Sequence, residues 1–225
     1  MQKSDYLVEL VDVHKSYGLT EVLRGVNLAI KPGEFVSIRG KSGVGKTNLF
    51  KIIGLLETAD KGTVNIFGKD ASTLSDDQKT ELRLKQMGLV FQFFNLLPSL
   101  TVLENIELPM ALNNVKKPQR TQRANELLEY FDLKKLSERF PENLSGGERQ
   151  RIAIIRGLVN HPSILLADEP TSSIDDENAD LLLELLGKIS HEQKVAVVLT
   201  STDLCEKLPT TKDYLLRDGQ LHPNP

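Results

Sequence analysis

Residues 40–47 restrict this chain more than any other part of its sequence. They read Gly-Lys-Ser-Gly-Val-Gly-Lys-Thr and satisfy the pattern G-x-x-x-x-G-K-[ST]. The apolar run 35–38 before them predicts a strand, and residues 48–53 after them favour a helix. A strand, a glycine-rich loop and a helix in this order place backbone N–H groups around phosphate oxygens. The segment therefore predicts a nucleotide site.

Each residue type in this loop has a chemical task. Lys46 is expected to reach the β- and γ-phosphates, and the Thr47 hydroxyl is expected to ligate Mg²⁺. The residues predicted to bind the nucleotide here are Gly40, Lys41, Ser42, Gly43, Val44, Gly45, Lys46, Thr47 and Asn48. A glycine-rich turn that binds nothing is the alternative, and the strand before the loop and the helix after it oppose that alternative.

Two adjacent acids, Asp168 and Glu169, follow the apolar run 164–167. At the carboxyl edge of a parallel sheet, Asp168 is expected to hold the water shell of Mg²⁺. Glu169, pointing the other way, is expected to polarise an attacking water as general base. An apolar run that ends in acids is common by itself. Together with the phosphate loop, the pair predicts hydrolysis of a nucleoside triphosphate.

Strand and helix patterns alternate along the chain, which predicts an α/β fold with a parallel sheet. Between the continuous apolar runs 164–167 and 195–199 lies a helical pattern over 181–189. Residues 119–140, bounded by Pro118 and Pro141, have helical spacing and predict a helical insert. The remaining predicted strands, separated by turns in the first part of the chain, are 7–11, 26–30 and 63–67.

Composition excludes several classes of partner and location. The 225 residues carry 28 Lys and Arg against 31 Asp and Glu, a net charge of −3, so no basic field favours nucleic acid. A single cysteine, Cys205, and a start without an apolar signal core predict a reducing cytosol. The uncharged stretch 86–103 contains amides and Pro98, so it is not expected to span a membrane.

Residues 144–151, Leu-Ser-Gly-Gly-Glu-Arg-Gln-Arg, open a second predicted helix. Its start could bind an anion through the Ser145 hydroxyl and the backbone N–H groups of Gly146 and Gly147. A glycine N-cap would explain one glycine but not two. The segment resembles the signature sequence of ATP-binding-cassette (ABC) ATPases, and it lies shortly before the paired acids as in that family.

The resemblance covers nearly the whole chain and implies an ABC-type P-loop NTPase fold. Such a fold has a mainly parallel sheet, an antiparallel β subdomain and a helical insert. It implies a single domain over 1–225, with an ATP-binding core at about 1–90 and 160–225. A helical subdomain with the signature is expected at about 93–158.

The same resemblance assigns roles to residues outside the phosphate loop. Tyr17 matches the aromatic residue that stacks on adenine, and Gln92 matches the glutamine that senses Mg²⁺ and the γ-phosphate. Glu169, Lys46 and Gln92 form the implied catalytic set. In such enzymes the signature closes over ATP held by a partner subunit, so a homodimer on ATP binding is implied. The implied contacts to the partner are Ser145, Gly146, Gly147 and Glu148 of the signature, and Ser173 and Asp175 of the crossing loop.

Residues 93–109 are similar to the segment of the lipoprotein-release, macrolide-export and cell-division group of ABC ATPases. Those ATPases drive permeases with large extracytoplasmic domains. The similarity implies an integral membrane permease partner and a location on the cytoplasmic face of the membrane. It also implies that stretch 86–103 forms an apolar groove for a helix of the permease, with burial inside the helical insert as the alternative. A non-transport role, signalling through a membrane partner, is a second interpretation.

Two positions depart from the family pattern. The family ends the strand 195–199 with Thr-His-Asp, and the corresponding residues here are Ser201-Thr202-Asp203, so Thr202 is expected at the switch position. Threonine has a shorter reach than histidine and cannot carry positive charge, which predicts slow hydrolysis. Asn48 replaces a hydroxyl residue on the α-phosphate, and we expect a modest effect on affinity.

Overall fold

A six-stranded sheet runs through the middle of the molecule. The computed structural model describes residues 5–204 and 207–224. The strand order is β10-β9-β3-β8-β7-β6, and all neighbours are parallel except the antiparallel edge strand β10. The strands are β3 (Phe35–Arg39), β6 (Met87–Val90), β7 (Ile164–Asp168), β8 (Ala196–Ser201), β9 (Lys212–Arg217) and β10 (Gln220–Pro223). The prediction of an α/β fold with a mainly parallel sheet is confirmed.

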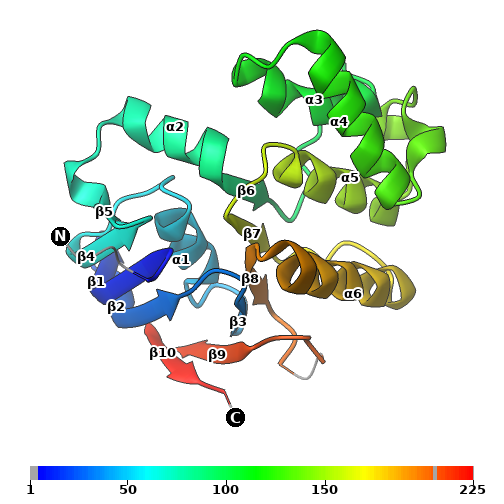
Figure 1. Ribbon diagram of the computed structural model, residues 1–225. Helices are drawn as coiled ribbons and strands as arrows, with labels where there is room; N and C mark the ends of the chain where they lie inside the picture. Colours follow the sequence, from blue (N-terminus) through cyan, green and yellow to red (C-terminus); the bar gives the residue numbers. More distant parts are fainter. Residues whose placement is uncertain (1–4, 205–206, 225) are drawn as a thin grey trace.

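Both faces of this sheet are buried because successive apolar side chains point in opposite directions. Val36 and Ile38 pack on the face covered by α1 (Lys46–Ile53), whereas Phe35 packs on the face of α5 (Gly146–Leu158) and α6 (Asp176–Gln193). Figure 1 shows α1 on one side of the sheet and α5 and α6 on the other. The core therefore consists of two clusters, one on each face.

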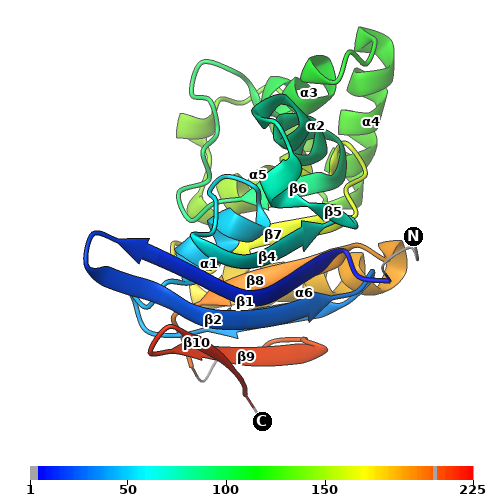
Figure 2. The same cartoon turned by 90° about the vertical axis from the view of Figure 1, so that its left-hand side faces the viewer.

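A second sheet, antiparallel and in the order β2-β1-β4-β5, covers the α1 side. Its strands are β1 (Val8–Tyr17), β2 (Thr20–Ile30), β4 (Lys61–Ile66) and β5 (Lys69–Asp70). Irregularities in the β1–β2 register allow the strand predicted at 7–11 to continue to Tyr17. Figure 2 shows the resulting long hairpin. The predicted antiparallel β region is confirmed.

Helices α3 (Val102–Leu112), α4 (Lys117–Tyr130) and α5 form a group at the β6 edge of the large sheet, beside α2 (Asp76–Gln86) (Figure 1). Helix α5 approaches β6 closely because Gly88 and Gly157 carry no side chain. A Cβ at Gly88 would lie 2.5 Å from the Gly157 carbonyl oxygen. The apolar residues of this group belong to the same cluster as one face of the sheet. The helices therefore share a core with the sheet.

The predicted helix 119–140 differs at both ends from the observed α4. Pro118 lies in its first turn, where a missing N–H costs nothing, so the helix starts earlier. It ends at Tyr130, because Asp132 adopts a left-handed backbone with φ 54°. Short 3₁₀ turns occur elsewhere in the described residues, at Ala71–Thr73, Lys134–Leu136 and Pro141–Asn143.

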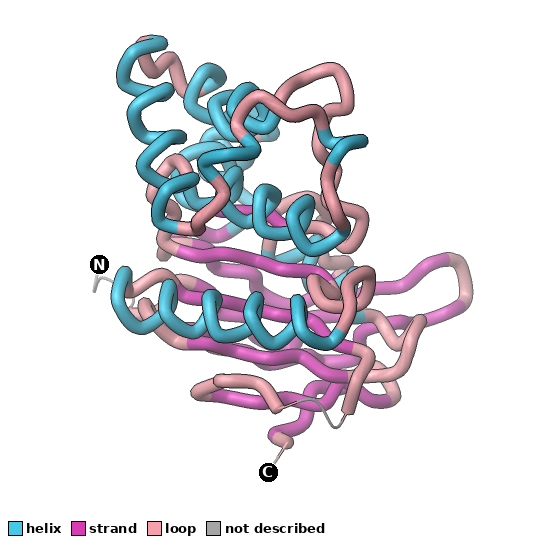
Figure 3. Tube along the Cα trace, turned by 90° about the vertical axis from the view of Figure 1, so that its right-hand side faces the viewer, coloured by secondary structure: helices cyan, strands magenta, loops and turns pink. Residues whose placement is uncertain are grey.

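Helix α6 lies along the strands of the large sheet (Figure 3) and extends beyond the predicted range 181–189. Its start is fixed by Asp175, whose Oδ1 accepts a hydrogen bond from the Asn178 N–H at 3.0 Å. None of the helices in the described residues combines the length and apolarity needed to cross a bilayer.

Candidate nucleotide-binding site

The phosphate loop connects β3 to α1 and needs its glycines for backbone geometry. Gly43 and Gly45 have φ of 77° and 113°, in the region where side chains are strained. A Cβ at Gly45 would also lie 2.8 Å from Val22 Cγ1 of β2. The loop therefore leads directly into the N-terminus of α1, where backbone N–H groups and the helix dipole favour an anion.

Lys46 begins α1 and is only 3% exposed. Its Nζ donates to the carbonyl oxygens of Gly40 at 2.8 Å and Lys41 at 3.1 Å. The same Nζ forms an ion pair with Glu169 Oε1 at 3.1 Å. The phosphate loop and the acid after β7 thus meet at one point, although they lie far apart in the sequence.

The two adjacent acids point to different partners. The Thr200 hydroxyl of β8 donates to Asp168 Oδ1 at 2.6 Å, and it accepts from the Glu169 N–H at 2.9 Å. Glu169 has φ 46°, a left-handed conformation that costs about 1–3 kcal/mol for a residue with a side chain. This turn of the backbone directs Glu169 to Lys46 while Asp168 stays on β7 beside Thr200.

Tyr17, at the end of β1, is 47% exposed and fixed by its hydroxyl. That hydroxyl donates to Glu57 and accepts from Asn48 Nδ2 at 2.7 Å. The hydrogen bond to the Glu57 carboxylate raises the pKa of Tyr17, and partial burial adds to the effect. Lys15 Nζ lies 5.4 Å from the ring centre. Asn48 therefore connects the phosphate loop to the aromatic ring, a role that sequence reasoning missed because only the fold joins the two.

Three oxygen-bearing side chains were predicted to hold Mg²⁺, and the donor set fits that ion. Thr47 follows Lys46 in α1, Asp168 ends β7, and Gln92 follows β6, the strand that pairs with β7. All three come from the same edge of the sheet, where Lys46 contacts Glu169. Hydroxyl, carboxylate and amide oxygens are ligands that Mg²⁺ accepts, usually together with water and phosphate oxygens. Within the described residues, no cluster of three His, Cys, Asp or Glu offers another metal site.

The predicted signature forms the N-terminus of α5. Ser145 caps the helix, because its Oγ accepts from the Glu148 N–H at 3.2 Å and its own N–H donates to Glu148 Oε2 at 2.8 Å. The hydrogen bond from the Ser145 backbone lowers the pKa of Glu148. Because Oγ acts as the acceptor, its own proton remains able to bind an anion.

The paired glycines of the signature have a structural role within the chain. A Cβ at Gly147 would lie 2.5 Å from Asn178 Oδ1, and one at Gly146 would lie 3.2 Å from the Ser173 carbonyl oxygen. The start of α5 therefore lies against the loop that leads into α6, which contains Ser173 and Asp175. In the described part of the chain, no hydrogen bond or ion pair joins residues 145–148 to the phosphate loop.

Comparisons with known proteins agree with this geometry. Residues 23–172 match the family model described as ABC transporter. The chain is 41% identical to the lipoprotein-releasing system ATP-binding protein LolD of Bdellovibrio bacteriovorus, over 93% of this chain and 97% of that protein. It is 37% identical to the macrolide export ATP-binding/permease protein MacB of Syntrophobacter fumaroxidans, over 96% of this chain and 31% of that protein.

A solved structure shows the same fold. An ATP-binding cassette in a dimeric post-hydrolysis state with ADP and Pi superimposes with a TM-score of 0.88 at 38% identity. The alignment covers 96% of this chain and 97% of the other. This chain belongs to the ABC transporter family of ATPases. The family resemblance and the ABC-type fold predicted from the signature are thereby confirmed.

The residues predicted to form the switch lie where β8 ends. The predicted residue Thr202 is exposed and follows the strand, whereas Ser201 is the last residue of β8 and 3% exposed. The register of β7 and β8 ends with the pair Asp168 and Thr200, one residue before Ser201. Ser201 is therefore a second candidate for the switch position beside the predicted Thr202, and neither residue is a histidine.

Proposed function

We propose that this ABC cassette binds Mg-ATP between two copies of itself and hydrolyses it to drive a membrane complex. The observation that supports this best is the contact of Lys46 with Glu169 at 3.1 Å, since it unites the phosphate loop with a carboxylate suited to act as base. The same contact also means that the cation and the base neutralise each other until phosphate enters.

Phosphate binding would separate these two groups. The γ-phosphate offers Lys46 a more highly charged partner than one carboxylate and two carbonyl oxygens. Once released, Glu169 accepts a proton from the attacking water, and Lys46 stabilises the charge that develops on the phosphate. Thr47, Asp168 and Gln92 would hold Mg²⁺, whose chemistry is to neutralise the phosphate oxygens during transfer.

The second half of each site would come from another copy. The α5 N-terminus offers an anion its backbone N–H groups and the Ser145 hydroxyl, yet within the described residues no hydrogen bond or ion pair joins it to the phosphate loop of its own chain. A head-to-tail pair would place this helix start over the nucleotide of the partner, with Ser173 and Asp175 beside it.

A groove between α2, α3 and α5 is suited to a helix of a permease. Its volume is about 350 Å³, and of the predicted stretch 86–103 only Met87 and Leu89 line it. The lining residues are Thr80, Arg83, Leu84, Met87, Leu89, Leu108, Pro109, Leu112, Arg156, Gly157 and Asn160. An apolar groove rimmed by arginines would accept an amphipathic helix with acidic ends. We therefore place the cassette on the cytoplasmic face of a membrane.

The experiment that tests the enzymatic proposal compares ATP hydrolysis by the wild type and Glu169→Gln. Glutamine is close in size but cannot accept a proton, so we expect kcat to fall by about 10²–10⁴-fold with nucleotide affinity preserved. Equal turnover by the two proteins would overturn the assignment of Glu169 as base. A substrate-flux assay in vesicles with the permease would then separate transport from signalling.

Slow hydrolysis is part of the proposal, because both switch candidates lack an imidazole. We expect histidine at the true switch position to raise kcat by about tenfold, since it can donate a hydrogen bond to the γ-phosphate. The variants Thr202→His and Ser201→His, measured side by side, decide between the two positions. If neither raises kcat, the missing histidine does not limit the rate.

A further inference from the structure

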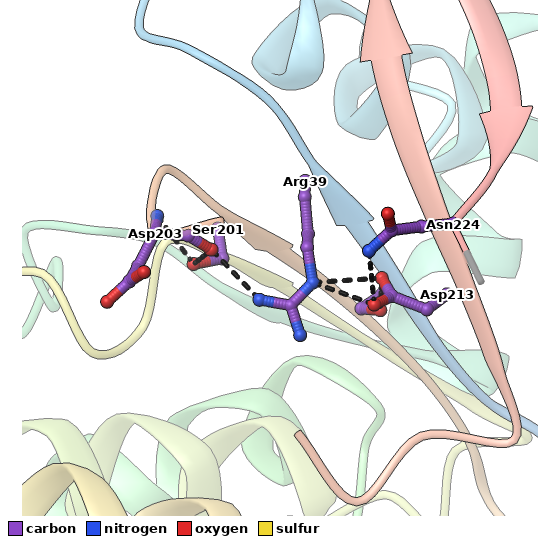
Figure 4. Close-up of polar contacts among 6 residues, drawn as sticks. Arg39, Ser201, Asp203, Asp213 and Asn224 are labelled. Atoms are coloured by element: carbon purple, nitrogen blue, oxygen red, sulfur yellow. Dashed lines mark hydrogen bonds and ion pairs between the residues drawn. The ribbon is translucent and has the colours of Figure 1, made fainter. Parts of the chain in front are cut away.

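Arg39, the residue immediately before the phosphate loop, connects two segments that are distant in the sequence. Its Nε donates to Asp213 Oδ2 at 2.8 Å and Oδ1 at 3.0 Å, and its Nη1 donates to the Asp203 carbonyl oxygen at 2.9 Å. Figure 4 shows the guanidinium between Ser201 and Asp203 on one side and Asp213 and Asn224 on the other. Arg39 is 4% exposed, so the contacts are shielded from water.

The carboxylate that holds Arg39 is itself fixed. Ser37 Oγ donates to Asp213 Oδ1, and Asn224 Nδ2 donates to Oδ2 at 2.9 Å. Burial opposes the ionisation of Asp213, but the hydrogen bonds from Ser37, Asn224 and Arg39 outweigh it and lower the pKa. The guanidinium therefore has a charged partner in a set orientation on β9, and its Nη1 is directed to the loop after β8.

The loop 201–203 at the end of β8 is held by two consecutive residues, Arg39 and Gly40, where the phosphate loop begins. The Gly40 N–H donates to the Ser201 carbonyl oxygen at 3.1 Å, while Arg39 binds the carbonyl oxygen two residues further on. Within the loop, the Asp203 N–H donates to Ser201 Oγ at 3.1 Å. Of these contacts only the one from Arg39 is charge-assisted, and such hydrogen bonds are about twice as strong as neutral ones.

The position of this loop affects the catalytic groups proposed above. Thr200, the residue before it, donates its hydroxyl to Asp168 and accepts from the backbone N–H of Glu169. A displacement of about 1 Å in such a site can reduce the rate by about 10²-fold.

We propose that Arg39 is a positioning residue for ATP hydrolysis, which holds the loop 201–203 in register with the phosphate loop through the Asp213 carboxylate. This inference rests on the proposed function, because it assumes that Glu169 and its neighbours hydrolyse ATP. It assigns a consequence for turnover to an ion pair that is not among the residues proposed to bind or hydrolyse ATP.

The test removes the whole pair, because a single substitution would leave a buried charge without its partner. In the double variant Arg39→Met/Asp213→Leu we expect kcat to fall about tenfold while KM for ATP and the Kd for a non-hydrolysable ATP analogue change less than about twofold. The matched control is Arg120→Met/Glu107→Leu, which removes a part-buried pair of 3.0 Å in the helical group. We expect the control to keep its kcat per folded molecule.

A conservative variant separates positioning from simple stability. Arg39→Lys keeps a positive charge for Asp213 but lacks the second donor that reaches Asp203, so kcat should remain reduced while the melting temperature is nearly restored. Full recovery of kcat by lysine, or an unchanged kcat in the double variant, would overturn the proposal.

Hydrogen exchange provides a readout that does not depend on turnover. In Arg39→Lys the amide of Asp203 should exchange faster than in the wild type, whereas the amides of β7 should not change. If the wild type hydrolyses no ATP, the proposed function fails, yet the exchange still reports whether Arg39 holds the loop. Equal exchange at Asp203 in both proteins would contradict the inference.

Discussion

At the scale of single residues, the Tyr17 hydroxyl joins the two ends of the proposed nucleotide site. It accepts from Asn48, which belongs to the phosphate-loop helix, and donates to Glu57. The ring expected to stack on adenine is thus oriented by a residue next to the phosphates. Asn48, which the resemblance matches to a hydroxyl residue of the family, donates its side-chain N–H to the Tyr17 hydroxyl.

We expect Asn48→Ala to weaken ATP binding by about three- to tenfold, because the hydrogen bond that orients Tyr17 is worth about 1 kcal/mol. In the Tyr17→Phe background the same substitution should cost nothing more, since the hydroxyl is already gone. Fluorescence titration with a labelled ATP analogue measures all four proteins of this cycle. An equal loss in both backgrounds would show that Asn48 acts on the phosphates instead.

Two histidines should titrate on opposite sides of the ordinary value of 6.5. A hydrogen bond to Glu21, assisted by Asp12, raises the pKa of His14. Burial and the nearby Arg123 lower the pKa of His161. His14 thus stabilises the fold below pH 6.5 and loses this effect as the pH rises through its folded pKa. His161 acts in the opposite sense, and its contribution is lost as the pH falls below 6.5.

Proton NMR of the histidine rings checks both directions in one titration. Glu21→Gln should move the midpoint of His14 down toward 6.5 and leave His161 where it is. A midpoint of His14 below that of His161 in the wild type would contradict the assignment.

At the scale of elements, the start of α5 is constrained by the start of α6. Gly147 lies where any side chain would meet Asn178, which is held by Asp175 and by Arg151 Nη1 at 3.1 Å. The second glycine of the signature therefore allows two helices to pack closely, in addition to its proposed role in anion binding.

Gly147→Ala should destabilise the protein by about 1–3 kcal/mol, because the added methyl group overpacks this contact. Gly147→Ala/Asn178→Ala should recover most of that loss, since the group that clashes is removed. Urea unfolding followed by circular dichroism gives the free energies for both variants and for Asn178→Ala as control. A clash elsewhere is indicated if the double variant is no more stable than Gly147→Ala.

At the scale of the whole molecule, the groove between the helical group and α2 presents an exposed apolar side chain, Leu112, to a partner. Leu112 is 64% exposed, so its replacement should not disturb the fold. Leu112→Glu should reduce co-purification with the proposed permease at least about tenfold, because a carboxylate would be buried in an apolar contact. Leu181→Glu, at an α6 leucine that is 50% exposed and lies outside the groove, is the control. Retained co-purification by Leu112→Glu would exclude this groove as the docking site.

Local patterns predicted those elements whose cause is local. Strands β3, β7 and β8 are buried along their whole length, as their continuous apolar runs predict, and all three were predicted within two residues. Helices α2 and α3 were missed, although Ser75 with Gln78 and Thr101 with Glu104 form capping boxes that signal their starts. Strands β9 and β10 carry weak alternation; β9 is stabilised by pairing with β3, and β10 by pairing with β9.

By itself, the sequence determined the phosphate loop, because glycine backbone conformations, a strand and a helix start depend on neighbouring residues only. It also determined the family, through contiguous motifs. The tertiary structure alone decided which side chains meet: Lys46 with Glu169, Asn48 with Tyr17, and Arg39 with Asp213. The two residues of each pair lie far apart in the sequence, and the order of the strands in the sheets brings them together. The hydrophobic pattern within one segment carries no information about such a contact.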